Sequence, residues 1–139
     1  MTLVGVKQNE INKRSLELNQ FVDVYIRVRT DLICNKVNKA TKVLHKIEVR
    51  NSGNISLSIV QWEKNGNPIS SYLPYRLPPC SIFNDAFYYF VLEENDNIVV
   101  FNVKFIDSIG RHWKNQIKAK KFGERWEVSC DKLEQVIND

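Results

Sequence analysis

Residues 98–105 read Ile-Val-Val-Phe-Asn-Val-Lys-Phe, and every second side chain from Val99 to Phe105 is apolar. Successive side chains of a β-strand point to opposite faces, so this period of two predicts a strand with one face in a core. The same alternation recurs, less regularly, over residues 22–28 and 43–49. The chain is therefore expected to be mainly β.

Turn signals separate these segments. Residues 51–54, Asn-Ser-Gly-Asn, predict a hairpin between the flanking strands, and Asn-Gly-Asn-Pro at 65–68 predicts a second turn. Because Pro cannot donate to a β-ladder, the strand near Ile69 should be short or at an edge. Residues 30–42 lack alternation and are expected to form a long connection that contains at most one short strand. The pattern predicts an antiparallel sandwich or small barrel of seven or eight short strands, with turns at about ten-residue spacing.

Two helices are expected outside the strands. Val4, Ile11 and Leu18 repeat every seven positions on a polar background, which favours a helix that docks on the domain or mediates assembly. Ser129 is placed to cap a short terminal helix. The predicted organisation is a helical N-terminal extension at 1–20, a β-sandwich domain at 21–129 and a C-terminal helix and tail at 130–139.

The composition favours a soluble globular protein. The chain has 139 residues, of which 43% are hydrophobic and 26% charged, and its net charge is +4. Three cysteines without a Cys-x-x-Cys pair favour reduced thiols and a reducing compartment. No apolar run is long enough for a membrane-spanning helix. We therefore expect a cytoplasmic protein or the soluble part of an anchored one.

Three motifs lie in and around the predicted strands. One strand ends in Asn-x-Gly at 51–53, a Leu-Pro-Pro bend follows at 77–79, and a later hairpin carries Phe105-x-Asp107-x-x-Gly110-x-x-Trp113. Over roughly residues 43–128 this arrangement resembles bacterial immunoglobulin-like β-sandwich domains of unassigned function. The resemblance implies that fold and carries over no catalytic residue. The sequence departs from antibody-type domains because no cysteine pair flanks Trp62.

Residue types that carry catalysis or bind metals are present but not clustered along the sequence. His45 and His112 are the two histidines, and His45 is expected as a hydrogen-bonded core or edge residue. No nucleophile elbow, phosphate-binding glycine loop or metal-ligand spacing is visible. We therefore expect no catalytic residue, no metal ligand and no cofactor, and predict a non-enzymatic protein.

Basic residues gather in one part of the chain. Residues 104–125 hold seven basic residues against two acidic ones, which predicts a cationic edge. Three explanations stay open, namely protection of an edge strand, contact with an acidic protein, and binding of single-stranded nucleic acid through phosphate attraction and base stacking. The candidate partner- or nucleic-acid-binding residues are Arg111, Trp113, Lys114, Lys118, Lys120, Lys121 and Arg125.

A second candidate surface is aromatic. Residues 87–90 read Phe-Tyr-Tyr-Phe, so rings occupy both faces of one predicted strand. The candidate aromatic interface is Tyr72, Tyr75, Tyr88 and Phe90, unless the N-terminal helix covers it. The favoured function is a protein-binding or accessory module, with self-association as one form of that binding. The alternative is a single-stranded nucleic-acid-binding β-barrel that uses the basic edge 104–125.

Overall fold

The computed structural model describes residues 20–34, 36–37, 41–69, 72–80 and 86–137. These residues form strands and connections and contain no helix. Ten strands occur within the described ranges, three more than the lower sequence estimate, because three of them are only three residues long. They are β1 (Val24–Cys34), β2 (Thr41–Asn51), β3 (Leu57–Lys64), β4 (Asn67–Ile69), β5 (Tyr75–Leu77), β6 (Tyr88–Leu92), β7 (Ile98–Asp107), β8 (His112–Phe122), β9 (Arg125–Cys130) and β10 (Glu134–Val136).

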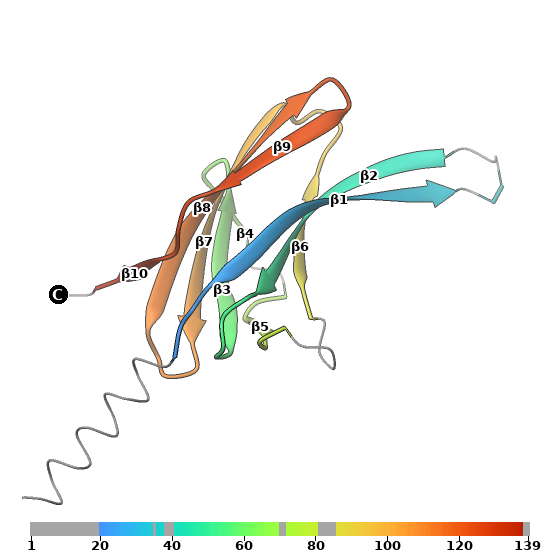
Figure 1. Ribbon diagram of the computed structural model, residues 1–139. Helices are drawn as coiled ribbons and strands as arrows, with labels where there is room; N and C mark the ends of the chain where they lie inside the picture. Colours follow the sequence, from blue (N-terminus) through green and yellow to red (C-terminus); the bar gives the residue numbers. More distant parts are fainter. Residues whose placement is uncertain (1–19, 35, 38–40, 70–71, 81–85, 138–139) are drawn as a thin grey trace, which may run out of the picture.

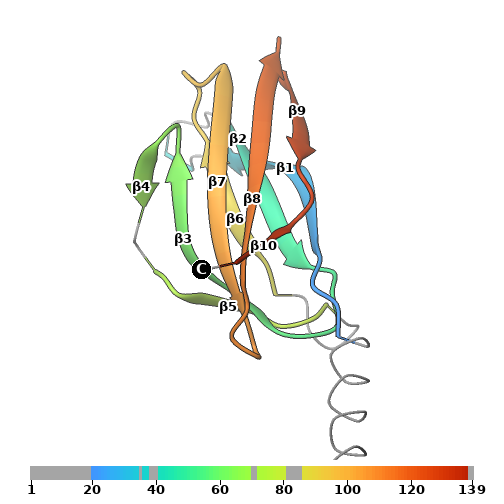
Figure 2. The ribbon, with the colours of Figure 1, turned by 90° about the vertical axis from the view of Figure 1, so that its left-hand side faces the viewer.

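The strands form two antiparallel sheets. The small sheet has the order β1-β2-β6, and the large sheet has the order β10-β8-β7-β3-β4, with β5 beside β3 and β9 beside β8. The sheets remain separate, so the barrel alternative is wrong. Figure 1 shows them diverging at one end, where the β1–β2 hairpin projects away from β8 and β9. Figure 2 shows β7 and β8 side by side in the large sheet.

The core lies between the facing sides of the two sheets. The stretch at 98–105 behaves as predicted, since Val99, Phe101, Val103 and Phe105 are all buried. Phe101 stacks at 4.8 Å on Phe90 of the small sheet, so the two layers meet through aromatic rings. Burying side chains of this size contributes about 1.5–3 kcal/mol each, which makes the inner faces the main source of stability.

The turn at Asn65 and Gly66 is confirmed. Both residues have positive φ angles, 50° and 84°, as a tight two-residue hairpin requires. The following strand β4 is three residues long, contains Pro68 and lies at an edge of the large sheet. The sequence expectation for this strand is therefore also confirmed.

The expected hairpin across residues 51–54 is wrong. β2 lies in the small sheet and β3 in the large one, so this turn carries the chain from one layer to the other. The side-chain amide of Asn51 donates to the carbonyl oxygens of Ile55 and Leu77, at 2.7 and 2.8 Å. Gly53 lies against the backbone of Phe21, where a Cβ atom would come within 2.5 Å of the carbonyl oxygen. The sequence correctly predicts a turn here, but this turn connects the two sheets instead of two paired strands.

The connection expected at 30–42 and the C-terminal helix are also wrong. β1 continues to Cys34 and β2 begins at Thr41, so most of that segment is strand. Residues 134–136 pair with residues 112–114 of β8 and complete the large sheet. This pairing outweighs the local capping preference of Ser129, which lies in β9. The predicted N-terminal helix lies outside the described residues, apart from residue 20.

Candidate functional site

The most distinctive surface is a two-stranded arm at the end of the small sheet (Figure 1). β6 ends opposite His45, so the β1–β2 hairpin continues beyond it. We define the arm as residues 30–34 and 41–44. Its side chains Leu32, Ile33 and Val43 are 71%, 49% and 43% exposed. Leu32 and Val43 are directly opposite each other in the ladder. The arm therefore presents apolar side chains to solvent where a folded core would bury them.

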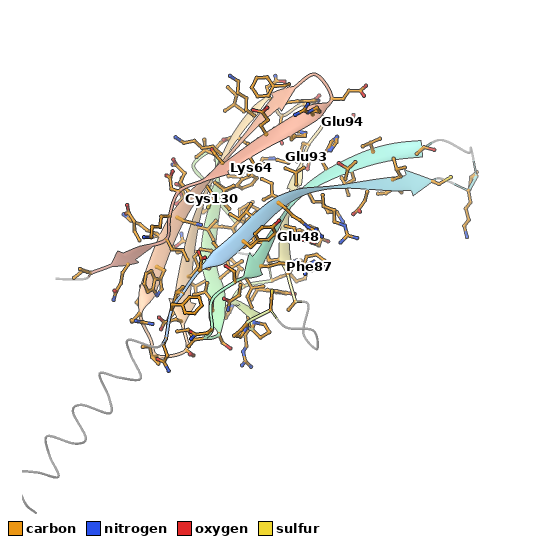
Figure 3. All side chains as sticks on the ribbon, viewed as in Figure 1. Glu48, Lys64, Phe87, Glu93, Glu94 and Cys130 are labelled. Carbon is orange, nitrogen blue, oxygen red and sulfur yellow. The ribbon has the colours of Figure 1, made fainter. Side chains whose placement is uncertain are left out.

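A cleft of about 770 Å³ opens between the arm and the ends of the two neighbouring hairpins. Its apolar lining includes Val43 of the arm and Trp126 of β9. Glu93 and Glu94, labelled in Figure 3, come from the β6–β7 turn on its acidic side. Lys121 also lines the cleft and donates to the carbonyl oxygen of Glu94 at 3.2 Å. The cleft thus combines an apolar wall with both signs of charge.

His45 also lines this cleft. It is half-buried, and its Nδ1 atom lies 3.1 Å from the hydroxyl oxygen of Thr30. This hydrogen bond agrees with the expected role as a structural histidine. Within the part of the chain that the structure describes, no three His, Cys, Asp or Glu side chains come together as a metal site would require. Cys34, Cys80 and Cys130 are free and exposed.

The outward side of the small sheet is an arginine face, formed by Arg27, Arg29, Lys46 and Arg50 with Glu48 and Asp31. Glu48 is fully buried within it, and its carboxylate accepts from Arg27 at 2.6 Å and Arg50 at 3.0 Å. Arg29 reaches the second oxygen of Glu48 at 3.4 Å. Burial alone would raise the pKa of Glu48, but the hydrogen bonds from Arg50 and Arg27 outweigh it and lower the pKa. The face is held together by this buried carboxylate.

Aromatic rings complete the arginine face. Arg50 lies 5.3 Å from the ring centroid of Phe87, and Lys46 lies 4.3 Å from that of Tyr89. Figure 3 shows Glu48 and Phe87 on the same part of the small sheet. Lys46 also pairs with Asp31 at 3.1 Å. All four cations of this face are therefore engaged within the protein.

The outward side of the large sheet is a lysine face, formed by Lys104 of β7 with Lys114, Lys118 and Lys120 of β8. The shared orientation of the three β8 lysines follows the predicted parity, with Asn115, Ile117 and Ala119 buried between them. β8 is not an edge, however, because β7 pairs on one side and β9 and β10 pair on the other. The predicted cationic edge is thus a sheet face, and edge protection does not explain its lysines.

Arg111 and Trp113 belong to a structural turn. The buried carboxylate of Asp107 accepts from the Nε atom of Arg111 at 2.6 Å and from the indole nitrogen of Trp113 at 2.9 Å. It also accepts from the backbone nitrogen of Arg111, while Gly110 has a φ of 89°. Burial raises the pKa of Asp107, but these hydrogen bonds lower it overall. The residues of the Phe-x-Asp-x-x-Gly-x-x-Trp motif therefore stabilise this turn. Trp113 lies on the opposite side of β8 from the lysines.

The remaining basic candidates divide between two places. Lys121 faces the cleft and lies 6.0 Å from the ring centroid of Trp126. Arg125 is exposed and also lines the cleft. The seven predicted residues thus contribute to a turn, a cleft and a face, and only three of them lie together on the lysine face.

The predicted aromatic interface is mostly interior. Phe90 is 1% exposed and lies in the core, so it cannot contact a partner. The Tyr88 hydroxyl accepts from the Trp62 indole at 3.0 Å, and the Tyr75 hydroxyl donates to the backbone of Phe87 at 3.2 Å. Tyr72 alone is strongly exposed, at 91%. The prediction that Tyr88 and Phe90 point outward is therefore wrong, since the outward-pointing ring of β6 is Tyr89.

The sequence reasoning missed the arm, the cleft and the buried Glu48 cluster. One signal was present for the arm, since residues 30–44 contain neither Gly nor Pro. Such a segment suits long strands better than an irregular connection. The cleft had no local signal, because its walls come from three hairpins far apart in the sequence.

No helix among the described residues is long and apolar enough to cross a membrane. The chain matches no protein-family model, no curated protein and no solved structure.

Proposed function

We propose that the protein is a non-enzymatic, protein-binding module of immunoglobulin-like topology and that the arm is its principal binding surface. The observation that carries the functional part is the exposure of Leu32, Ile33 and Val43 on a hairpin that extends beyond the supporting strand β6. An isolated two-stranded ribbon is marginally stable in water. A partner that covers these side chains would bury apolar area and stabilise the ribbon.

The strand order supports the immunoglobulin-like part. Such domains place strands A, B and E in one sheet and C, F and G in the other, and a strand C′ joins the second sheet in some of them. Here β1, β2 and β6 correspond to strands A, B and E, and the order β4-β3-β7-β8 corresponds to C′-C-F-G. Trp62 lies on β3, the counterpart of strand C, and contacts Phe90 across the core at 4.6 Å. β9 and β10 extend the large sheet beyond that pattern.

Site-specific photo-crosslinking in the native cell tests the function. A crosslinking amino acid at Ile33 should capture a protein, whereas one at Glu127, on the outward side of β9, should not. Adding Leu32→Ser and Val43→Ser should reduce the Ile33 crosslink by about tenfold, because two exposed apolar contacts are lost. Thermal unfolding should hardly change, since neither side chain belongs to the buried core. Equal capture from Ile33 and Glu127, or no effect of the serines, would contradict the proposal.

A second function rests on the lysine face. Lys104 and Lys118 have no carboxylate within ion-pair distance among the described residues, so their charge is available to a polyanion. A labelled single strand of DNA should then be retained at about 50 mM salt and released as salt rises. Changing Lys114, Lys118 and Lys120 to Gln should abolish retention. Retention that persists in this variant would exclude the lysine face as the nucleic-acid site.

A further inference from the structure

β1 is an edge strand of the small sheet. Within the described part of the chain it hydrogen-bonds only to β2, in an uninterrupted register from Val24 to Cys34. Natural sheets protect such edges with Pro, bulges, short strands or inward-pointing charges. The edges of the large sheet are made of shorter strands: β4 and β5, of three residues each, lie on one side, and β10, of three residues, and β9, of six, lie on the other. β1 has eleven residues, no Pro and no bulge. Its charged residues all point outward, and its inward-pointing residues are uncharged.

The accessible part of this edge is its arm half. β9 approaches β1 near the body of the protein, and the two strands then diverge toward the arm (Figure 1). Among the described residues, no strand pairs with the outer backbone N–H and C=O groups of residues 28–34. An added antiparallel strand would supply the missing hydrogen bonds and extend the small sheet.

The charges on β1 favour a second copy of β1 as that strand. Two antiparallel copies related by a twofold axis must pair residues of equal parity, because opposed residues point to the same face. A register centred on Thr30 places Arg29 opposite Asp31 of the second copy, twice by symmetry. It also places Val28 opposite Leu32 of the second copy.

The neighbouring registers are worse. A register centred on Val28 places Arg27 opposite Arg29 of the second copy, and registers centred on Arg29 or Asp31 place each of these residues opposite itself. Like charges directly opposed across strands are destabilising. The Thr30 register alone among these gives only complementary charge pairs.

We propose that the protein forms a homodimer by antiparallel pairing of the arm halves of two β1 strands, centred on Thr30. This inference rests on the proposed protein-binding role of the arm and names its partner as a second copy of the chain. The two small sheets join into one continuous sheet, β6-β2-β1-β1-β2-β6. Leu32, exposed in the single chain, then packs beside Val28 of the second copy.

Charge exchange tests the register. Sedimentation of the full chain should show a dimer that dissociates on dilution. Arg29→Asp or Asp31→Arg each places like charges opposite one another at both positions, so each should weaken the dimer by at least about tenfold. An equimolar mixture of the two variants should dimerise again, because each mixed pair is complementary. Lys118→Asp, which makes the same charge change on the lysine face, should leave the dimer unaffected.

Far-UV circular dichroism of each variant checks that it folds, and a double variant then tests the register again. This check is needed because Arg29 also contacts Glu48, Asp31 also pairs with Lys46, and the two residues pair with each other within the chain. The chain carrying both Arg29→Asp and Asp31→Arg keeps complementary pairs and should dimerise by itself. A monomeric wild-type chain at all concentrations, or a mixture that fails to dimerise, would overturn the homodimer. If Ile33 still crosslinks to another protein in that case, the arm remains a binding surface and only its partner has been misassigned.

Discussion

Four cations lie on the arginine face and four on the lysine face, but the two faces hold them differently. On the small sheet, Glu48 and Asp31 pair with all four, at distances of 2.6–3.4 Å. On the large sheet, Lys114 has one carboxylate at 4.0 Å, and Lys104 stands opposite another lysine in the ladder. The first face uses its charge to organise a sheet, and the second offers its charge to solvent. Net charge along a sequence does not distinguish these uses.

The largest effect on this contrast is expected from Glu48→Gln. The substitution removes the buried anion to which three arginines donate, so the free energy of unfolding should fall by about 2 kcal/mol. Urea denaturation measures this loss. The matched change Lys118→Gln on the lysine face should cost less than about 0.5 kcal/mol. Similar losses for the two variants would remove the distinction between the faces.

The next largest difference between the two faces is expected in the dependence of stability on acidic pH. The pKa of Glu48 is lowered in the folded protein, so its stabilising contribution is present at neutral pH and is lost as pH falls through that lowered pKa. The free energy of unfolding should therefore drop below about pH 4. Glu48→Gln should make this drop smaller, whereas the lysine variants should leave it unchanged. The pKa of Asp107 is lowered in the same sense, so part of the drop should persist in Glu48→Gln. An unchanged acid profile in Glu48→Gln would contradict the role of this carboxylate.

The smallest effect is expected from Lys104→Gln. Lys104 faces Lys114 directly across β7 and β8, so removing one of these like charges should stabilise the protein by a few tenths of a kcal/mol. The gain should shrink as salt screens the repulsion. Thermal unfolding at low and high salt measures both. A clear loss of stability would show that Lys104 has a stabilising partner instead.

Local patterns predicted the parts of this fold that depend on local geometry. The alternation at 98–105 identified the inward side of β7, and the shared parity of Lys114, Lys118 and Lys120 identified their common face. Parity alone does not say which of two faces is buried when both carry rings. For this reason residues 88–90 are correctly predicted to lie on one strand, but Phe90 is in the core instead of on the outward side.

The sequence by itself determined where most strands run and where the chain turns, because side-chain alternation and backbone conformation at residues such as Gly66 are properties of neighbouring residues. Only the tertiary structure decided which strands pair. Every strand offers the same backbone donors and acceptors, so nothing local marks the turn at 51–54 as a crossover or β8 as an interior strand. The same choice of partners left β1 with an open edge and the arm beyond β6, and these features carry the proposed function.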